Sequence, residues 1–540
     1  MSKNKNLTIE EAFNLAIQNH QNNNLQDAKS YYQKVLKIDP NHLGVLNNLG
    51  VIFQDLGEYQ KAKDCYEKVI KINPSYTDAH YNLGVTFKKL GKHQQAKECY
   101  EKAIELNPNY INAFNNLGGV FQDLGDFQKA KECFEKAIKI DPLNLNANYN
   151  IGNVFKELQD YQKAKECYEK VIEINPTYAY AYNNLGSTLK ILREYQKAKE
   201  CYEKAIEINP NYSNAHNNLG VVFSDLKETQ KAKSCYEKAI KSDPNYASAH
   251  SNLGNTLKIL DENEKAIDCY KTAKRIDPNI NCDVSFAAAY LKNKDPNNAL
   301  ILLKTYLKKY PKNPRANAYK TIALRGLERF DEIEELIDFS NLVRTINTEI
   351  LTSEKIFEFN KELRSALIED PRRRKEKNTQ GWAIRGGTVI RNLFETTNHS
   401  ILKFEIFLKK AIDYYISNLP DNIEHPFLMG KTKKYTIDTC WANLLTPGDF
   451  QSSHIHNNGW MSGVYYLDEP EIEPNKEHAG WIEFNRAGYN LPHFAGEKGI
   501  ELIKPKAGMF IFFPSYVWHG TIPYTHKHNR ISISFDIQVN

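Results

Sequence analysis

Two patterns of hydrophobic and polar positions divide this chain of 540 residues. Up to about residue 338, apolar residues recur at helical spacing in short segments that end at Asp-Pro or Asn-Pro, where proline cannot continue a helix. Beyond that point, apolar and polar residues alternate in short runs separated by Gly, Pro and Asn, which is typical of strands. The sequence therefore predicts a multidomain protein, with an all-α region followed by a β-rich domain.

The helical region is a repeat array. Prolines preceded by Asp or Asn recur every 34 residues, at positions 40, 74, 108, 142, 176, 210, 244 and 278. The units carry a motif such as Asn116-Leu117-Gly118 and then Ala-Lys-x-Cys-Tyr, as at residues 96–100. Small residues let two helices approach closely, so each unit predicts helix, turn, helix and stop. Period and motif resemble the tetratricopeptide repeat family, which implies a superhelix of helix pairs.

The repeats become irregular at their C-terminal end. Ala288 takes the place of the motif glycine, and Asn313-Pro314 follows the previous stop after 36 residues. Such atypical units are expected where a solenoid caps itself or docks onto another domain. We expect a solenoid over residues 7–338, with eight clear repeats to residue 278, a helical linker over 339–379 and a β domain over 380–540.

One polar position forms a ladder along the predicted first helices. Its members are Asn14, Asn48, Asn82, Asn116, Asn150, Asn184, Asn218 and Asn252. The ladder is similar to that of the protein O-linked N-acetylglucosamine transferases, whose amides grip an extended polypeptide. An Asn amide both donates and accepts, as a peptide bond does. The resemblance implies a protein or peptide partner along the concave surface; the alternative is that these amides bond within the solenoid.

The second region predicts strands at residues 388–394, 435–445, 462–467, 481–484, 508–514 and 530–539. In the last of them Ile531 and Ile533 alternate with Ser532 and Ser534, the pattern of a half-buried strand. Residues 508–513 are apolar on both faces and indicate an inner strand. Helical segments at 353–369 and 400–419 would pack outside the sheet. A double-sheet barrel of jelly-roll type, also called a double-stranded β-helix, is the expected fold.

Composition and charge limit the class of protein, its partners and its location. Hydrophobic residues make up 41% and charged residues 25%, as in an average folded protein, and a net charge of +5 includes no sustained basic block. The cluster at residues 372–375 is expected to be a solvated loop, so no nucleic-acid partner is predicted. The N-terminus has no apolar leader, and no run of eighteen apolar residues occurs. We expect no membrane association and a cytoplasmic location.

Three histidines of the β domain are candidate metal ligands. In an extended strand, residues i and i+2 point to one face, so His454 and His456 can converge on one ion. His519 would add a third nitrogen. Neutral imidazoles suit zinc, copper, nickel and iron, and three protein ligands leave coordination positions open for reactants.

The motif around these histidines resembles the 2-oxoglutarate- and iron(II)-dependent oxygenases, within about residues 380–540. Their pattern is His-x-Asp/Glu, a long gap, a second His, and a basic residue followed by x-Ser, here His454-x-His456, His519 and Arg530-Ile531-Ser532. The resemblance implies Fe(II) held by the three histidines, 2-oxoglutarate as cosubstrate and dioxygen. Arg530 would bind the distal carboxylate of the cosubstrate with help from Ser532, because its guanidinium is a planar fork. Asn443 would also face the cosubstrate.

The sequence departs from that pattern at His456, where a carboxylate is usual. The site then resembles the three-histidine sites of thiol dioxygenases, which do not use 2-oxoglutarate. His456 is either a ligand or a residue behind the ligands or facing substrate. The remaining histidines of the domain, His478, His493, His526 and His528, are expected on the surface. Trp460 and Trp518 are expected in the barrel wall, and Cys440 has no partner that would make it a nucleophile.

These observations favour a dioxygenase that hydroxylates a polypeptide held by the repeats. One alternative is an interaction scaffold whose three-histidine barrel is inactive or independent of 2-oxoglutarate. Another is an oxygenase of small molecules or glycans that uses the repeats for targeting.

Overall fold

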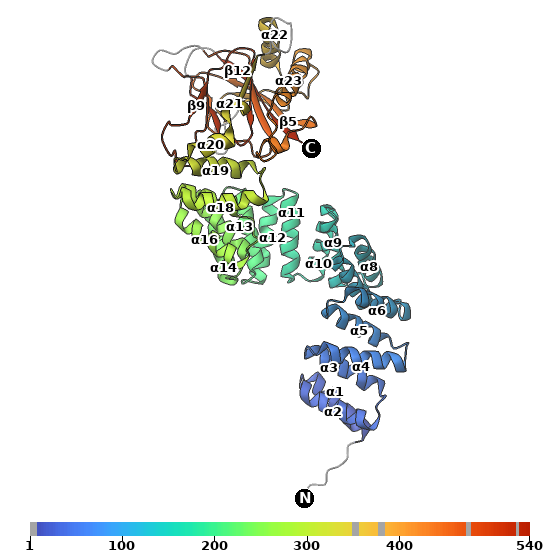
Figure 1. Ribbon diagram of the computed structural model, residues 1–540. Helices are drawn as coiled ribbons and strands as arrows, with labels where there is room; N and C mark the ends of the chain where they lie inside the picture. Colours follow the sequence, from blue (N-terminus) through green and yellow to red (C-terminus); the bar gives the residue numbers. More distant parts are fainter. Residues whose placement is uncertain (1–7, 348–355, 376–383, 471–476, 525–528, 540) are drawn as a thin grey trace. The chain divides into compact units, whose positions relative to one another are not determined.

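The computed structural model describes residues 8–347, 356–375, 384–470, 477–524 and 529–539. The chain divides into two compact units, Met1–Pro244 and Asn245–Asn540, and each is described by itself (Figure 1). Helix pairs come first and an antiparallel β domain follows, so the predicted fold class is confirmed. None of the helices in the described ranges has the length together with the apolar character that crossing a bilayer demands.

The described part of the first unit consists of helix pairs. The first helix of each pair is α1 (Ile9–Gln21), α3 (Leu43–Asp55), α5 (Thr77–Lys89), α7 (Ile111–Asp123), α9 (Leu145–Glu157), α11 (Ala179–Ile191) or α13 (Ser213–Asp225). The second is α2 (Leu25–Ile38), α4 (Tyr59–Ile72), α6 (His93–Leu106), α8 (Phe127–Ile140), α10 (Tyr161–Ile174), α12 (Tyr195–Ile208) or α14 (Thr229–Ser242). Each second helix ends just before the Asp-Pro or Asn-Pro proline.

The motif glycine is required by close packing within each pair. A Cβ atom built on Gly118 of α7 would lie 2.7 Å from the Phe134 ring of α8, and one on Gly50 would lie 2.6 Å from the Tyr66 ring. Both rings are fully buried. The glycine and the aromatic residue 16 positions later therefore form one interlocking contact, which explains why the two recur together.

Replacing Gly118 with alanine is expected to lower the free energy of unfolding by about 1–3 kcal/mol, because the added methyl group overpacks a filled interface. Gly119→Ala in the same helix is the matched control. A Cβ at Gly119 meets only the flexible Lys88 Nζ, at 3.0 Å. There the better helix propensity of alanine should raise stability by up to about 1 kcal/mol. Urea midpoints of the full chain followed by circular dichroism check this; equal midpoints for the two variants would contradict it.

The second unit begins with six helices: α15 (Ala247–Ile259), α16 (Asn263–Ile276), α17 (Asp283–Lys292), α18 (Pro296–Lys309), α19 (Pro314–Gly326) and α20 (Phe330–Ile337). The last two pack directly on the β domain. Trp518 Nε1 donates to Ala318 O of α19 at 3.0 Å, and Tyr516 Oη donates to Leu336 O of α20 at 2.8 Å. Arg325 Nε and Nη2 donate to carbonyls of the 494–496 loop, both at 2.8 Å. The irregular end of the array thus docks onto the barrel.

The β domain is built of two main antiparallel sheets. The larger has the order β1-β10-β7-β12-β5-β4-β2, and a smaller one has the order β11-β8-β9. Strand bounds are β1 (Arg344–Asn347), β2 (Arg374–Lys375), β3 (Ile384–Arg385), β4 (Thr388–Ile390), β5 (Tyr435–Leu445), β6 (Phe450–Gln451), β7 (Met461–Tyr466), β8 (Ile482–Phe484), β9 (Glu501–Ile503), β10 (Met509–Pro514), β11 (His519–Thr521) and β12 (Arg530–Val539).

The strand order is that of a jelly roll. If β5 to β12 are numbered one to eight, strands one, eight, three and six (β5, β12, β7 and β10) are successive neighbours in the larger sheet. Strands seven, four and five (β11, β8 and β9) are successive neighbours in the smaller sheet. The second strand, β6, continues into a bridge between His454 and His519 and so extends the smaller sheet. This alternation between two sheets closes a barrel, and it brings the histidine segments side by side.

Helices cover the outer face of the larger sheet, as the sequence predicts (Figure 1). Phe404 and Tyr415 of α23 (His399–Ser417) stack on Phe510 and Phe512 of β10. The helix α22 (Ile356–Glu369) packs on α23, and its predicted first residues, 353–355, lie outside the described residues. Two short elements complete the domain, α21 (Phe339–Leu342) and the 3-10 helix η2 (Leu428–Gly430).

The strand β12 differs from its predicted half-buried state. The apolar residues Ile531, Ile533 and Phe535 face the covered outer side, but the alternating polar residues are also buried, because they line the barrel interior. The predicted strand at 388–394 ends early, at Ile390. A positive φ of 48° at Asn392 breaks the extended path there.

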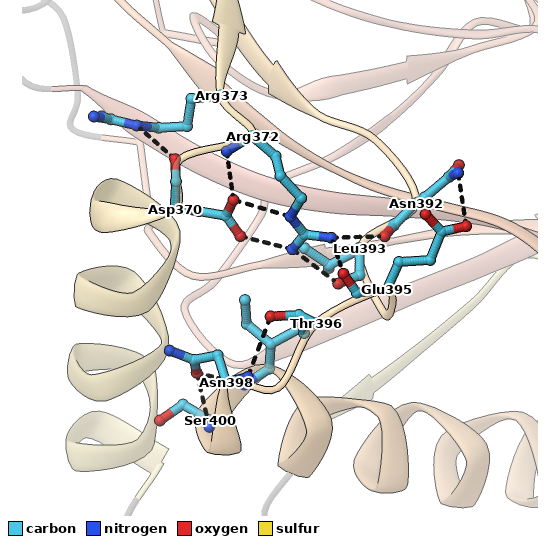
Figure 2. A network of polar contacts seen from close by, with 10 residues as sticks. Asp370, Arg372, Arg373, Asn392, Leu393, Glu395, Thr396, Asn398 and Ser400 are labelled. Atoms are coloured by element: carbon cyan, nitrogen blue, oxygen red, sulfur yellow. Dashed lines mark hydrogen bonds and ion pairs between the residues drawn. The ribbon is translucent and has the colours of Figure 1, made fainter.

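The prediction that residues 372–375 form a solvated loop is wrong for Arg372. Its guanidinium joins two segments of the chain by hydrogen bonds, an arrangement called the clamp below (Figure 2). Its Nε and Nη2 donate to the carboxylate of Asp370 at 3.0 and 2.6 Å. Its Nη1 donates to Asn392 O at 3.0 Å and to Glu395 O at 2.8 Å. Asp370 is buried, and the hydrogen bonds from Arg372 are the largest cause lowering its pKa. The clamp ties the end of α22 to the turn that follows β4.

Candidate metal centre

The three candidate ligands come from two neighbouring segments at one end of the barrel. His454 N donates to His519 O at 2.9 Å and His519 N donates to His454 O at 3.1 Å, so the two backbones pair. His456 N donates to Ser515 O at 3.0 Å. The histidine segment lies beyond the end of β6 rather than within a regular strand. Its extended backbone nevertheless places both imidazoles on the same side.

The Nε2 atoms of the three rings converge. His456 Nε2 lies 3.1 Å from His454 Nε2 and 3.2 Å from His519 Nε2, and within the described ranges these three residues form a cluster able to hold a metal ion. Two nitrogens at right angles about 2.1 Å from one ion would be about 3.0 Å apart. The ring arrangement therefore suits three ligands on one face of an ion.

Hydrogen bonds at the opposite ring nitrogens determine the tautomers. His454 Nδ1 lies 2.8 Å from Ser452 O, and His519 Nδ1 lies 3.0 Å from Val517 O. His456 Nδ1 lies 2.7 Å from Asp536 Oδ2. Carbonyl and carboxylate oxygens only accept, so each Nδ1 carries a proton and each neutral ring has a bare Nε2. Three lone pairs this close together require a shared cation, either a proton on His456 or a metal ion.

Burial keeps two of these rings neutral. It lowers the pKa of His454 to about 3, with a further contribution from neighbouring His456. Burial also lowers the pKa of His519 well below its ordinary value, and His454 and His456 lower it further. Neutral imidazoles are the form that coordinates metals, so both rings are ready to bind an ion over the physiological pH range.

Asp536 of β12 lies beside the candidate ligands, and the sequence motif does not predict this. Its carboxylate accepts from His456 Nδ1, from Ser462 Oγ at 2.6 Å and from Thr439 Oγ1 at 3.1 Å. Burial alone would raise the pKa of Asp536, but the electrostatic interaction with His456 and these hydrogen bonds outweigh it, and the pKa lies below its ordinary value. Asp536 is therefore an ionised carboxylate hydrogen-bonded to His456, the candidate ligand at the position where the resembling pattern has a carboxylate.

Arg530, Ser532 and Asn443 are buried, with exposed fractions of 4%, 3% and 0%. Arg530 lines a hollow of its own with Asp468 and Tyr524. Ser532 and Asn443 face each other across the β5–β12 pair. Arg530 Nη1 donates to Gly480 O, and its guanidinium lies 5.0 Å from the centre of the Tyr466 ring. Burial lowers the pKa of this guanidinium.

Two buried polar atoms in this interior lack a hydrogen-bond partner among the described residues, Arg530 Nε and Asn443 Oδ1. The described residues also offer no carboxylate within ion-pair distance of Arg530. Unsatisfied buried polar groups are costly in a folded protein, so they indicate a site for a polar ligand. A dicarboxylate such as 2-oxoglutarate fits Arg530, and the three Nε2 atoms fit Fe(II).

Two hollows reach the histidines. A pocket of about 310 Å³ is lined by His456, Asp536, Trp441, Asn392 and Val389, and the Trp441 ring stacks on His456. A cleft of about 840 Å³ runs from His454 to Ile259 and Lys292, on α15 and α17. The cleft therefore connects the last repeats with the metal centre.

The other candidate residues lie apart from the centre. His478 and His493 are exposed, and His526 and His528 lie outside the described residues. Trp460 stacks on Phe427, and Trp518 stacks on Tyr319 of α19, so both belong to the barrel wall. Cys440 is a buried free thiol, and burial raises its pKa well above the ordinary value.

The asparagine ladder bonds to the preceding repeat. Asn82 Nδ2 donates to Asn47 Oδ1 at 3.2 Å, and Asn116 Nδ2 donates to Tyr81 Oη at 3.0 Å. Asn184 and Asn218 make equivalent bonds to residues 35 positions earlier, and Asn48 donates to Tyr32 Oη. These bonds correspond to the alternative in which the amides join neighbouring helices. The Oδ1 atoms of Asn82 and Asn116 accept no hydrogen bond from the described residues.

Comparisons with known proteins give the family. Residues 439–536 match the family model described as "Putative 2OG-Fe(II) oxygenase". Tetratricopeptide repeat models match residues 13–42, 45–76, 77–110, 111–144, 146–178, 179–212, 213–246 and 247–280. The chain joins tetratricopeptide repeats to an oxygenase domain of this family. The oxygenase match begins at Thr439 and ends at Asp536, two residues that are hydrogen-bonded to each other at the metal centre.

Solved structures are similar over parts of the chain. They include MamA, with 26% identity over 30% of this chain and 95% of its own, at a TM-score of 0.29. YrrB, titled a TPR protein with an unusual peptide-binding site, has 24% identity over 34% of this chain and 95% of its own, at 0.30. A tetratricopeptide repeat protein from Parabacteroides merdae has 18% identity over 46% of this chain and 98% of its own, at a TM-score of 0.38. No curated protein matches the sequence.

Proposed function

We propose that this chain is a cytosolic 2-oxoglutarate- and Fe(II)-dependent dioxygenase that hydroxylates a side chain of a polypeptide bound by its repeats. The observation that carries the proposal is the convergence of three bare Nε2 atoms in a barrel of the oxygenase family. The buried Arg530 guanidinium, with its unsatisfied Nε in the same barrel, supports the choice of a carboxylate cosubstrate. In a three-histidine centre that does not use 2-oxoglutarate, the buried positive charge of Arg530 would have no carboxylate to bind.

Each residue has a role in this proposal. His454, His456 and His519 hold the iron, and Arg530 with Ser532 holds the distal carboxylate of 2-oxoglutarate. Turning the Asn443 amide over would let Ser534 Oγ donate to Oδ1 and free Nδ2 to donate to the cosubstrate. With dioxygen, the iron and cosubstrate supply the oxidant for hydroxylation of a C–H bond, and succinate and carbon dioxide are released.

A polypeptide substrate is supported by the surroundings of the centre. The cleft that begins at His454 continues to the first helices of the last repeats, so an extended segment lying on those helices can reach the iron. The pocket beside His456, of about 310 Å³, is large enough to admit a large side chain of a bound polypeptide. Within the repeats, the Oδ1 atoms of Asn82 and Asn116, whose amide nitrogens donate to the preceding repeat, can accept backbone N–H groups of the bound segment.

The test is turnover by the purified full-length chain. With Fe(II), 2-oxoglutarate and isotope-labelled dioxygen, a peptide library should acquire labelled oxygen while succinate is released in equal amount. Removal of the iron by a chelator should abolish both products. The Asn82→Ala/Asn116→Ala chain should keep succinate release without peptide but lose its stimulation by peptide. An iron-loaded chain that neither binds nor consumes 2-oxoglutarate would overturn the proposal in favour of an inactive barrel on a repeat scaffold.

A further inference from the structure

The metal centre holds one carboxylate that the sequence motif does not contain. This carboxylate is that of Asp536, and each of its oxygens lies within hydrogen-bond distance of His456 Nδ1, at 2.6 and 2.7 Å. The side chains of His456 and Asp536 have exposed fractions of only 11% and 13%. In so little water a carboxylate and an imidazole interact strongly.

The fold builds this contact from several elements. Ser462 of β7 and Thr439 of β5 each donate a hydroxyl to Asp536, which lies between them on β12. The β5–β12 pair also changes register at this point, where Asp536 pairs with Thr439 but Ile537 pairs with Ile437. Such irregularities reorient side chains near active sites. The carboxylate is thus fixed in direction by three donors and a shift in register.

We propose that Asp536 is a positioning residue that supplies, through His456, the negative charge that a carboxylate ligand gives in the His-x-Asp pattern. Three neutral imidazoles add no charge to a divalent ion, so Asp536 restores the net charge of a centre with two histidines and one carboxylate. It also holds His456 in the tautomer with a bare Nε2 and raises the basicity of that ring. The inference rests on the proposed function only in taking the bound ion to be Fe(II).

The test is Asp536→Asn, which keeps the size of the side chain and an oxygen that accepts from His456 but removes the charge. Fe(II) affinity, measured anaerobically on the full-length chain, should fall about 10- to 100-fold. The absorption spectrum of the Co(II)-loaded chain should change, and the reduction potential of bound iron should rise, because Fe(III) loses more stabilisation than Fe(II). Asp438→Asn is the matched control, since Asp438 is the exposed neighbour on β5, and it should match the wild type.

Ser462→Ala separates a purely structural role from the proposed one. It removes one donor to Asp536 but keeps the charge, so its Fe(II) affinity should stay closer to wild type than that of Asp536→Asn. Equal affinities, spectra and potentials for wild type and Asp536→Asn would overturn this inference and leave the proposed function standing. A wild-type chain that binds no divalent ion would overturn both.

Discussion

His519→Ala is expected to abolish iron binding and turnover. His519 contributes one of three converging nitrogens and also pairs its backbone with His454, at the centre of the proposed site. Losing a ligand should weaken Fe(II) affinity by more than the about 10- to 100-fold typical of residues behind the ligands. Succinate release should fall to the level of the metal-free chain. Anaerobic Fe(II) titration and succinate assay measure both effects.

Controls separate this result from misfolding. His519 is buried against Phe513, with ring centres 4.4 Å apart, so the variant leaves a small cavity, and its thermal melting should be recorded beside the wild type. His454→Ala should give the same loss of iron binding, whereas His399→Ala, at an exposed position at the start of α23, should give none. A folded His519→Ala chain with unchanged iron affinity would show that the three rings do not hold the metal.

Arg530→Ala is expected to raise the KM for 2-oxoglutarate about 100-fold. A buried guanidinium that grips a carboxylate makes charge-assisted hydrogen bonds worth about 1.5–3 kcal/mol each, and about 2.7 kcal/mol corresponds to a factor of 100. Fe(II) affinity without cosubstrate should change by less than about threefold, since Arg530 contacts Gly480 and Tyr466 rather than the histidines. Titration with 2-oxoglutarate on the iron-loaded chain provides the measurement.

Arg530→Lys gives a graded comparison. It keeps the positive charge but replaces the planar fork by a point charge, so its KM should lie between those of wild type and Arg530→Ala. A KM unchanged in both variants would mean that the cosubstrate carboxylate is held elsewhere. Loss of iron affinity in Arg530→Ala alone would instead indicate that the cavity disturbs the barrel.

The sequence predicted elements whose pattern is local. The helix pairs follow from a period of 34 residues, and β5 and β12 follow from alternation, with the bounds that the structure has. The sequence does not predict the strand β1, because four residues after a short helix carry little pattern of their own. It forms by pairing with β10, from Arg344 opposite Phe512 to Asn347 opposite Met509. Its existence depends on a partner strand more than 160 positions away.

The candidate ligands could also be found in the sequence, because spacing in an extended backbone places His454 and His456 on one side and the Arg530-x-Ser532 signal lies a fixed distance beyond His519. The role of Asp536 could not be found in the sequence. In the sequence it is one more polar residue of an alternating strand, and only the strand order shows that the polar side of β12 faces the barrel interior.

Sequence alone thus determined that repeated helix pairs precede a jelly roll with three histidines and an arginine, since these features arise from periodicities and short spacings. Tertiary structure alone decided that ladder amides bond to the preceding repeat, that Arg372 clamps the turn after β4, and that Asp536 meets His456 across 80 positions. The physical reason is that hydrogen bonds between distant side chains depend on how helices stack and strands pair, which no local pattern encodes.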